Sequence, residues 1–195
     1  MVGVFHFLQD GWIVIKLRIY VLYVTIILMN RVNGLEFAAL DELPRPQVIL
    51  GVGIPGSGKS TVLGELASER GYTLISPDSI REELTGDAAN QSVNGKAWDI
   101  AYERARHALK KEESIVIDAT YSLRSRRLEA INICRSVGAA SMIAVHLDTP
   151  LSETRERNRS RDRVVPDHAL VRMHQQLINC PISLDEGFDT IITIR

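Results

Sequence analysis

The stretch that decides the fold reads Gly53-Ile54-Pro55-Gly56-Ser57-Gly58-Lys59-Ser60-Thr61. Its spacing matches the phosphate-binding loop pattern G-x-x-x-x-G-K-[ST]. An apolar run at 48–52, typical of a buried parallel strand, precedes it, and residues 62–70 can continue as a helix. Strand, glycine-rich turn and helix in this order are the context that the motif requires. This agreement argues against a glycine-rich turn that binds nothing.

The chemistry of this loop follows from its residue types. Glycines let backbone N–H groups close around phosphate oxygens, and the helix that begins there adds the positive end of its dipole. We therefore expect Lys59 to reach the β- and γ-phosphates of a nucleotide and the Ser60 hydroxyl to bind Mg²⁺.

Composition limits the possible functions. The chain has 195 residues and a net charge of −1, enough for one α/β domain and too little charge for a general attraction to nucleic acid or anionic membranes. Any nucleic-acid binding must be local, and arginine, which suits phosphate contacts, outnumbers lysine 18 to 5. Cys134 and Cys180 match no metal spacing and indicate reduced thiols in a cytoplasmic protein.

Residues 1–46 form an atypical N-terminal extension. Their apolar run at 19–29 is too short to span a membrane, and Lys16 and Arg18 interrupt the apolar sequence before it. We predict no stable membrane association, with secretion or a membrane tether as weaker alternatives. The extension either adds strands, since residues 15–21 alternate, or is sequence translated upstream of a start at Met29.

From residue 47 onward, strand and helix patterns alternate to the end of the chain. This pattern predicts one domain over 47–195 with the three-layer α/β/α fold of P-loop NTPases and a mostly parallel sheet. The loop at 86–94 has the composition of a disordered segment. Predicted strands are 48–52, 72–76, 114–118, 141–147 and 190–194; predicted helices are 59–70, 79–84, 95–112, 124–137, 151–161 and 166–178.

Two aspartates follow predicted strands, at the edge of the sheet where such folds bind ligands. Asp118 ends the apolar run 115–117 and can hold Mg²⁺ through water, although aspartate also forms turns at strand ends. Asp78 can accept the proton of an attacking hydroxyl while Arg81, one turn later, grips a substrate phosphate. Asp78 can equally be a simple first-turn residue of a helix that Ser76 caps.

Two arginine-rich segments suggest phosphate contacts. In a helix over 151–161, Arg157 and Arg161 would share one face, and the crowded like charges favour a mobile helical lid over a polyphosphate, as against a solvated basic helix. The segment 120–127, with Arg124, could bind a second phosphate or a nucleic-acid backbone, or simply begin a helix. Trp98 and Tyr102 fit a core position better than a base-stacking platform.

Taken together, the phosphate loop, Ser-Pro-Asp-Ser-Ile-Arg at 76–81, Asp-Ala-Thr-Tyr-Ser-Leu-Arg-Ser-Arg-Arg at 118–127 and Arg-Asn-Arg-Ser-Arg at 157–161 resemble the bacteriophage polynucleotide kinase domain. They also resemble the related small P-loop kinases and AAA-type ATP-binding (AAA_33-like) proteins. The resemblance covers about residues 48–177. It implies that ATP phosphates are bound by Gly53, Pro55, Gly56, Ser57, Gly58, Lys59, Ser60 and Thr61.

The same resemblance assigns roles at the acceptor side. Asp78 would be the general base for a 5′-hydroxyl, and Arg81 would touch the 3′-phosphate of the substrate. Asp118 and Thr120 would build the metal or acceptor site, although Ala119 separates two residues that are adjacent in the phage pattern. Arg157 and Arg161 would be the lid arginines, catalytic together with Lys59, and Arg124 would contact substrate.

The sequence therefore predicts an ATP- and Mg²⁺-dependent kinase that transfers the γ-phosphoryl group to a hydroxyl, in the first place at a nucleic-acid 5′ end. A kinase for a small hydroxyl-bearing molecule or a tRNA-linked acceptor remains an alternative, because one fold serves all of these. A nucleotide-dependent regulatory ATPase without an acceptor is the alternative from another class.

Overall fold

The computed structural model describes residues 37–161 and 163–195, and the chain divides into two units, one that ends at Glu42 and one over Leu43–Arg195. Of the first unit it describes Phe37 and the short 3₁₀ helix η1 (Ala38–Glu42). The expectations for residues 1–36, namely extra strands, an internal start and the apolar run, lie outside the described residues. Within the described residues, no helix combines the length and the apolar character needed to cross a bilayer.

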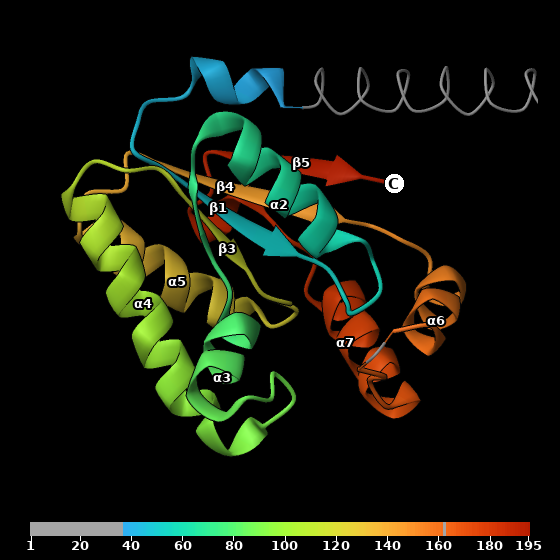
Figure 1. The fold of residues 1–195 in the computed structure, drawn as a ribbon. Coiled ribbons are helices and arrows are strands. Elements are labelled where there is room, and N and C mark those ends of the chain that lie inside the picture. The colour runs from blue at the N-terminus through green and yellow to red at the C-terminus, as the bar shows by residue number, and fades with distance from the viewer. Residues whose placement is uncertain (1–36, 162) are drawn as a thin grey trace, which may run out of the picture. The chain divides into compact units, whose positions relative to one another are not determined.

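The second unit is built on a five-stranded parallel sheet in the order β2-β3-β1-β4-β5 (Figure 1). Every neighbouring pair is parallel, and β1 and most of β4 are buried, as expected for strands covered on both faces. The predicted fold class is confirmed. The strands are β1 (Gln47–Val52), β2 (Thr73–Ile75), β3 (Ile115–Asp118), β4 (Ser141–Leu147) and β5 (Thr190–Ile194).

The helices agree with the predicted ranges to within a few residues. The helix at Asp78 begins two residues earlier than predicted, because Pro77 takes its first position and the Ser76 hydroxyl accepts a hydrogen bond from the Ser79 amide. The helices are α2 (Lys59–Arg70), α3 (Pro77–Thr85), α4 (Asn94–Lys110), α5 (Arg124–Ser136), α6 (Leu151–Arg159) and α7 (Asp167–Asn179), with short 3₁₀ helices η2 (Gln91–Val93) and η3 (Leu184–Glu186).

Helices cover both faces of the sheet, with α2 above it and α4 and α5 below it in Figure 1. A Cβ added at Gly51 of β1 would collide with the side chain of Leu63, so this glycine lets α2 lie close to the strand. The opposite face packs on α4 and α5. Tyr102 belongs to that core and Trp98 packs against it, which confirms the expected core position of both aromatic residues.

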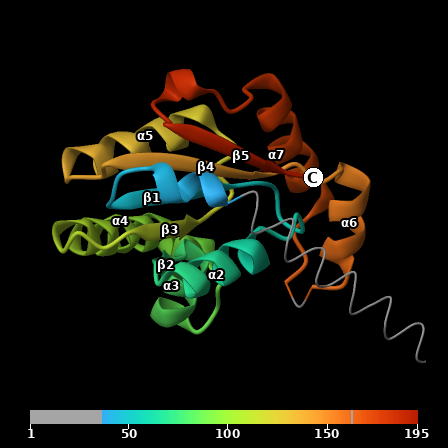
Figure 2. The ribbon, with the colours of Figure 1, turned by 90° about the horizontal axis from the view of Figure 1, so that it is seen from above.

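Two helical segments, α6 and α7, lie beyond the carboxyl ends of the strands (Figure 2). α6 ends at Arg159, two residues before the predicted end. The buried side chain of Asn158 bonds both the amide of Val165 (3.1 Å) and its carbonyl oxygen (2.8 Å), which holds the following loop against the helix end. Arg157 and Arg161 therefore do not share a helical face, and that expectation was wrong.

The loop at 86–94 was expected to be disordered, and the structure contradicts this. Asn90 caps η2 by accepting a hydrogen bond from the Ser92 amide at 3.0 Å. The carbonyl oxygen of Ala88 accepts hydrogen bonds from two arginine side chains, Arg81 and Arg163. The polar residues that suggested disorder instead supply caps and anchors.

Candidate functional site

The glycine-rich loop joins β1 to α2 at the carboxyl edge of the sheet. The Gly53 amide donates to the carbonyl oxygen of Thr120 at 3.1 Å, which ties this loop to the loop after β3. Gly58 caps α2 with φ of 90°, a left-handed conformation that suits glycine. Ser60 and Thr61 occupy the first turn of α2 and are exposed.

Lys59, the first residue of α2, meets Asp118, the last residue of β3. The sheet register sets Gly51 beside Asp118, and the Lys59 ammonium group forms an ion pair with the Asp118 carboxylate. The two side chains are 11% and 10% exposed, so the charges lie in a largely desolvated position at the strand edge. The structure thus brings together the lysine and the acid that the sequence placed 59 residues apart.

The loop has the features of an anion cradle. A Cβ added at Gly56, where φ is 87°, would lie 2.6 Å from the Thr154 carbonyl oxygen, so the main chain has no room for a side chain. The Ser57 hydroxyl is buried and has no hydrogen-bond partner within the described residues. An orphaned hydroxyl in a glycine-rich loop at the N-terminus of a helix fits a phosphate ligand.

The donor set also fits a hard cation. Among the described residues, no group of three or more His, Cys, Asp or Glu side chains is arranged to hold a metal. The Ser60 hydroxyl and the Asp118 carboxylate offer the few oxygen ligands that Mg²⁺ takes from proteins when nucleotide phosphates and water supply the rest.

Asp78 lies in the first turn of α3 and contacts two arginines. Its carboxylate pairs with Arg81 and, at 3.0 Å, with Nη1 of Arg163 from the α6–α7 loop. The Arg81 side chain is only 5% exposed and also donates to the Ala88 carbonyl (2.9 Å) and the Asn94 side chain (2.8 Å). These contacts favour a role for Arg81 in positioning Asp78 over direct contact with a substrate phosphate.

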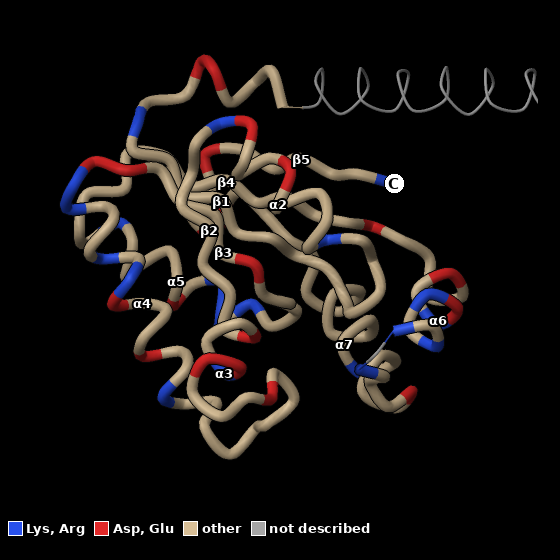
Figure 3. Tube along the Cα trace, in the orientation of Figure 1, with Lys and Arg blue, Asp and Glu red and all other residues tan. Residues whose placement is uncertain are grey.

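The arginine-rich segment reaches the glycine-rich loop through one residue. Nη1 of Arg157 donates to the Ser57 carbonyl at 3.4 Å, and Thr149 donates to the same oxygen at 3.0 Å. Arg157 also pairs with Glu153 one turn earlier. Arg161 is exposed and makes no ion pair among the residues that the structure describes. Figure 3 shows basic and acidic positions mixed on α6.

The loop after β3 is held by packing and by a buried ion pair. Tyr121 has φ of 45°, uncommon for a residue with a side chain, and it packs edge-on against Trp98 with ring centroids 5.6 Å apart. Burial raises the pKa of Tyr121 well above its ordinary value, so the phenol is neutral. Its fixed conformation positions Thr120, whose carbonyl oxygen binds the glycine-rich loop.

The basic cluster at 124–127 is only partly a surface. Arg124 and Arg126 are exposed, and Arg124 approaches Glu186 to 4.0 Å. Arg127 is fully buried and forms two hydrogen bonds with the buried Glu186, at 2.6 and 2.7 Å. The prediction that Arg127 belongs to a phosphate-binding cluster was therefore wrong, because its side chain is not exposed to a ligand. The sequence alone could not distinguish it from its neighbours.

The residues missed by sequence analysis lie where distant segments meet. Arg163 reaches Asp78 across 85 residues of sequence, and Asn158 sets its path by anchoring the loop. Only the crowding of arginines at 155–163 signalled that this segment was unusual.

Comparison with known proteins identifies the family. The profile of the AAA_33 family, described as an AAA domain, matches residues 48–178. The chain belongs to the AAA_33 family. A curated relative, the replication factor C large subunit of Methanococcus aeolicus, is 35% identical over 72 residues, which cover 33% of this chain and 15% of that protein. The chain therefore spans a small part of that relative.

Solved structures show the same fold in kinases. A putative kinase from Chloroflexus aurantiacus is 17% identical, with a TM-score of 0.59 over 77% of this chain and 88% of that one. A chain of the Pnkp1/Rnl/Hen1 RNA repair complex is 24% identical, with a TM-score of 0.62 over 74% and 47%. Shikimate kinase from Acinetobacter baumannii is 18% identical, with a TM-score of 0.51 over 77% and 84%. This AAA_33 protein has the P-loop kinase fold, and the closer resemblance to the phage domain stays a prediction.

Proposed function

We propose that this AAA_33 protein is an ATP- and Mg²⁺-dependent kinase that phosphorylates the 5′-hydroxyl end of a nucleic acid. The observation that carries the proposal is the ion pair between Lys59, which follows the glycine-rich loop, and Asp118 at the end of β3. Asp78 follows β2, the strand beside β3, at the same edge of the sheet. A lysine placed to bind ATP phosphates and a separate, exposed carboxylate at the same edge of the sheet suit phosphoryl transfer to an acceptor better than ATP hydrolysis alone.

The chain's own residues would divide the work of transfer. Amides of the glycine-rich loop and the Lys59 ammonium would hold the β- and γ-phosphates, and Arg157 would offset charge on the transferring group. Asp78 would accept the proton of the attacking hydroxyl as the acceptor oxygen bonds to the γ-phosphorus and the bond to ADP breaks. Mg²⁺ held by Ser60 and Asp118 would neutralise phosphate charge.

Three observations support a nucleic-acid end as the acceptor. The Asp78 side chain is 56% exposed, so the terminus of a long strand can reach it. Arg124 and Arg126 are exposed at the start of α5, which follows the loop after β3. The fold also occurs in a chain of an RNA repair complex.

A small-molecule kinase is the second candidate, and one observation favours it. The similarity covers 88% of the putative kinase and 84% of shikimate kinase, but only 47% of the RNA repair chain. Shikimate kinase, whose solved structure contains the small molecule shikimate, therefore shares the fold over most of its length. Salt dependence separates the candidates, because a polyanionic acceptor gives a steep slope and a neutral metabolite a flat one.

The experiment is transfer of labelled γ-phosphate from ATP to a panel of RNA and DNA with 5′-hydroxyl ends, nucleosides, sugars and water. We expect label on nucleic-acid ends, and Lys59→Ala should lose more than about 100-fold in rate, because charge-stabilising donors contribute ~3 kcal/mol. Label on sugars alone would favour the second candidate. Label released only to water would refute the kinase assignment.

Asp78→Asn tests whether an acceptor is used at all. Transfer should fall by at least about 100-fold, in the range of general-base catalysis, while ATP affinity measured by calorimetry should hold. Asp99→Asn, at an exposed position on α4, is the matched control and should retain transfer. An Asp78→Asn variant with unchanged ATP turnover would indicate the regulatory ATPase instead.

A further inference from the structure

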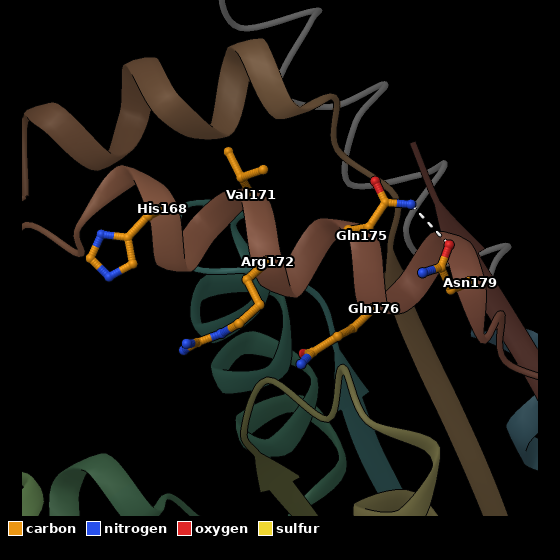
Figure 4. Close-up of a pocket in the computed structure, with 6 residues that line it drawn as sticks. All are labelled: His168, Val171, Arg172, Gln175, Gln176 and Asn179. Carbon is orange, nitrogen blue, oxygen red and sulfur yellow. Dashed lines mark hydrogen bonds between the residues drawn. The ribbon is translucent and has the colours of Figure 1, made fainter.

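An open groove of about 500 Å³ runs along one face of α7 (Figure 4). The positions that line it are spaced by three or four residues, so they form one stripe about 16 Å long on the helix. No lining residue is acidic, although the chain contains 24 acidic residues. The groove is lined by His168, Val171, Arg172, Gln175, Gln176 and Asn179.

The groove lies beside the candidate site. The Ser122 hydroxyl donates to Oε1 of Gln176 at 2.8 Å, which joins α7 to the loop after β3. Two residues earlier in that loop, the Thr120 carbonyl oxygen binds the Gly53 amide of the glycine-rich loop. Figure 4 shows Arg172 and Gln176 on the side of α7 that faces the loop after β3.

Arg172 is the charged group available in this groove. Arg155, Arg157 and Arg163 are each paired with a carboxylate. Arg172 is exposed and has no ion pair in the part of the chain that the structure describes. Its guanidinium group can therefore take an external anion without first breaking an internal bond.

A second exposed cation lies towards the end of the groove. Arg127 donates to the carbonyl oxygen of Cys180, which follows α7 directly, and also binds Glu186. Arg124 lies 4.0 Å from the same Glu186 carboxylate and is half exposed. Because Glu186 already accepts two hydrogen bonds from Arg127, it neutralises Arg124 only in part. Positive charge thus continues from Arg172 towards the start of α5.

We propose that the α7 groove binds the sugar–phosphate backbone of the acceptor strand, with Arg172 contacting a phosphate. This inference rests on the proposed function and names the surface that the strand follows. An open stripe of this length with a free guanidinium and amide side chains suits an extended polyanion. A small metabolite would leave most of it uncovered. Gln175 donates to Asn179 at 2.9 Å, and the remaining polar atoms of these two amides can bond sugar or base edges without strict sequence preference.

The test compares Arg172→Gln with wild type on two acceptors with 5′-hydroxyl ends, a nucleoside 3′-phosphate and a longer oligonucleotide. We expect the KM for the oligonucleotide to rise about tenfold, as for the loss of one charge-assisted hydrogen bond. The kcat, and the KM for the nucleoside 3′-phosphate, should stay unchanged. The slope of log KM against log salt should fall by about 0.7 for the lost contact with a single strand.

Matched variants separate a phosphate contact from loss of structure. Arg104→Gln removes an exposed arginine of α4 that pairs with Glu83 and does not line the groove, so it should leave both KM values unchanged. Arg172→Lys should recover part of the oligonucleotide affinity. An equal loss of activity on both acceptors, or no loss on either, would overturn the inference.

Direct binding keeps this inference distinct from the proposed function. Fluorescence anisotropy of a labelled oligonucleotide needs no catalysis, and Arg172→Gln should weaken it by a similar factor. If wild type phosphorylates nucleic-acid ends but Arg172→Gln binds oligonucleotide normally, the strand does not bind in the α7 groove, and the proposed function is unaffected. If wild type neither binds nor phosphorylates nucleic acid, the proposed acceptor and the groove fail together.

Discussion

Replacing Arg127 with methionine tests how far the loop beside the candidate site depends on one buried ion pair. Arg127 and Glu186 are both 0% exposed. The guanidinium also donates to the carbonyl oxygens of Tyr121 (3.1 Å) and Cys180 (3.1 Å). One side chain therefore joins α5, the loop after β3, the end of α7 and η3.

The magnitude follows from what the substitution leaves behind. Methionine fills most of the space, but the Glu186 carboxylate loses its two short hydrogen bonds and stays buried. Removing one partner of a buried pair costs about 3–5 kcal/mol, a large share of the roughly 5–15 kcal/mol that stabilises a domain. At about 2–4 °C per kcal/mol for a chain of this size, Tm should fall by ~6–20 °C.

Thermal unfolding followed by circular dichroism measures the effect. Arg126→Met is the matched control, because Arg126 is the adjacent residue of α5 and pairs with Glu129 at 2.8 Å on the surface. Such exposed pairs contribute less than about 1 kcal/mol. The double variant Arg127→Met/Glu186→Leu should recover part of the loss, because no buried charge remains. If Arg127→Met lowered Tm no more than Arg126→Met, the buried pair would not have the importance argued for it.

Three further measurements test other parts of the structure. Gly56→Ala should weaken Mg·ATP binding more than about tenfold in calorimetry, because its Cβ would lie 2.6 Å from the Thr154 carbonyl oxygen at a positive φ; unchanged affinity would contradict the cradle. Burial raises the pKa of Cys134 to about 12, so a thiol reagent at mildly alkaline pH should modify the exposed Cys180 rapidly and Cys134 only after denaturation; equal rates would show that Cys134 is accessible. Burial lowers the pKa of His146, so below about pH 6.5 the unfolded chain binds the extra proton and the free energy of unfolding should fall with falling pH; His146→Gln should flatten that dependence, and an unchanged slope would assign it to other groups.

The local patterns of the sequence were sufficient for the fold and for half of the candidate site. The apolar runs 48–52 and 115–117 are typical of buried strands, and the glycine spacing at 53–58 determines the loop between β1 and α2. Because parallel strands end at one edge of the sheet, Asp118 could be placed near Lys59 without a structure.

Only the tertiary structure determines which arginines are exposed and which carboxylate each of the others binds. Arg124, Arg126 and Arg127 look alike in sequence, yet two are exposed and one is buried against Glu186, 59 residues away. Arg163 reaches Asp78 across 85 residues of sequence because Asn158 anchors the α6–α7 loop against the end of α6. Periodicity and turn chemistry act over a few residues, so the sequence by itself determines the helices, strands and turns. The partner of a long charged side chain depends on how those elements assemble, and only the assembled chain determines it.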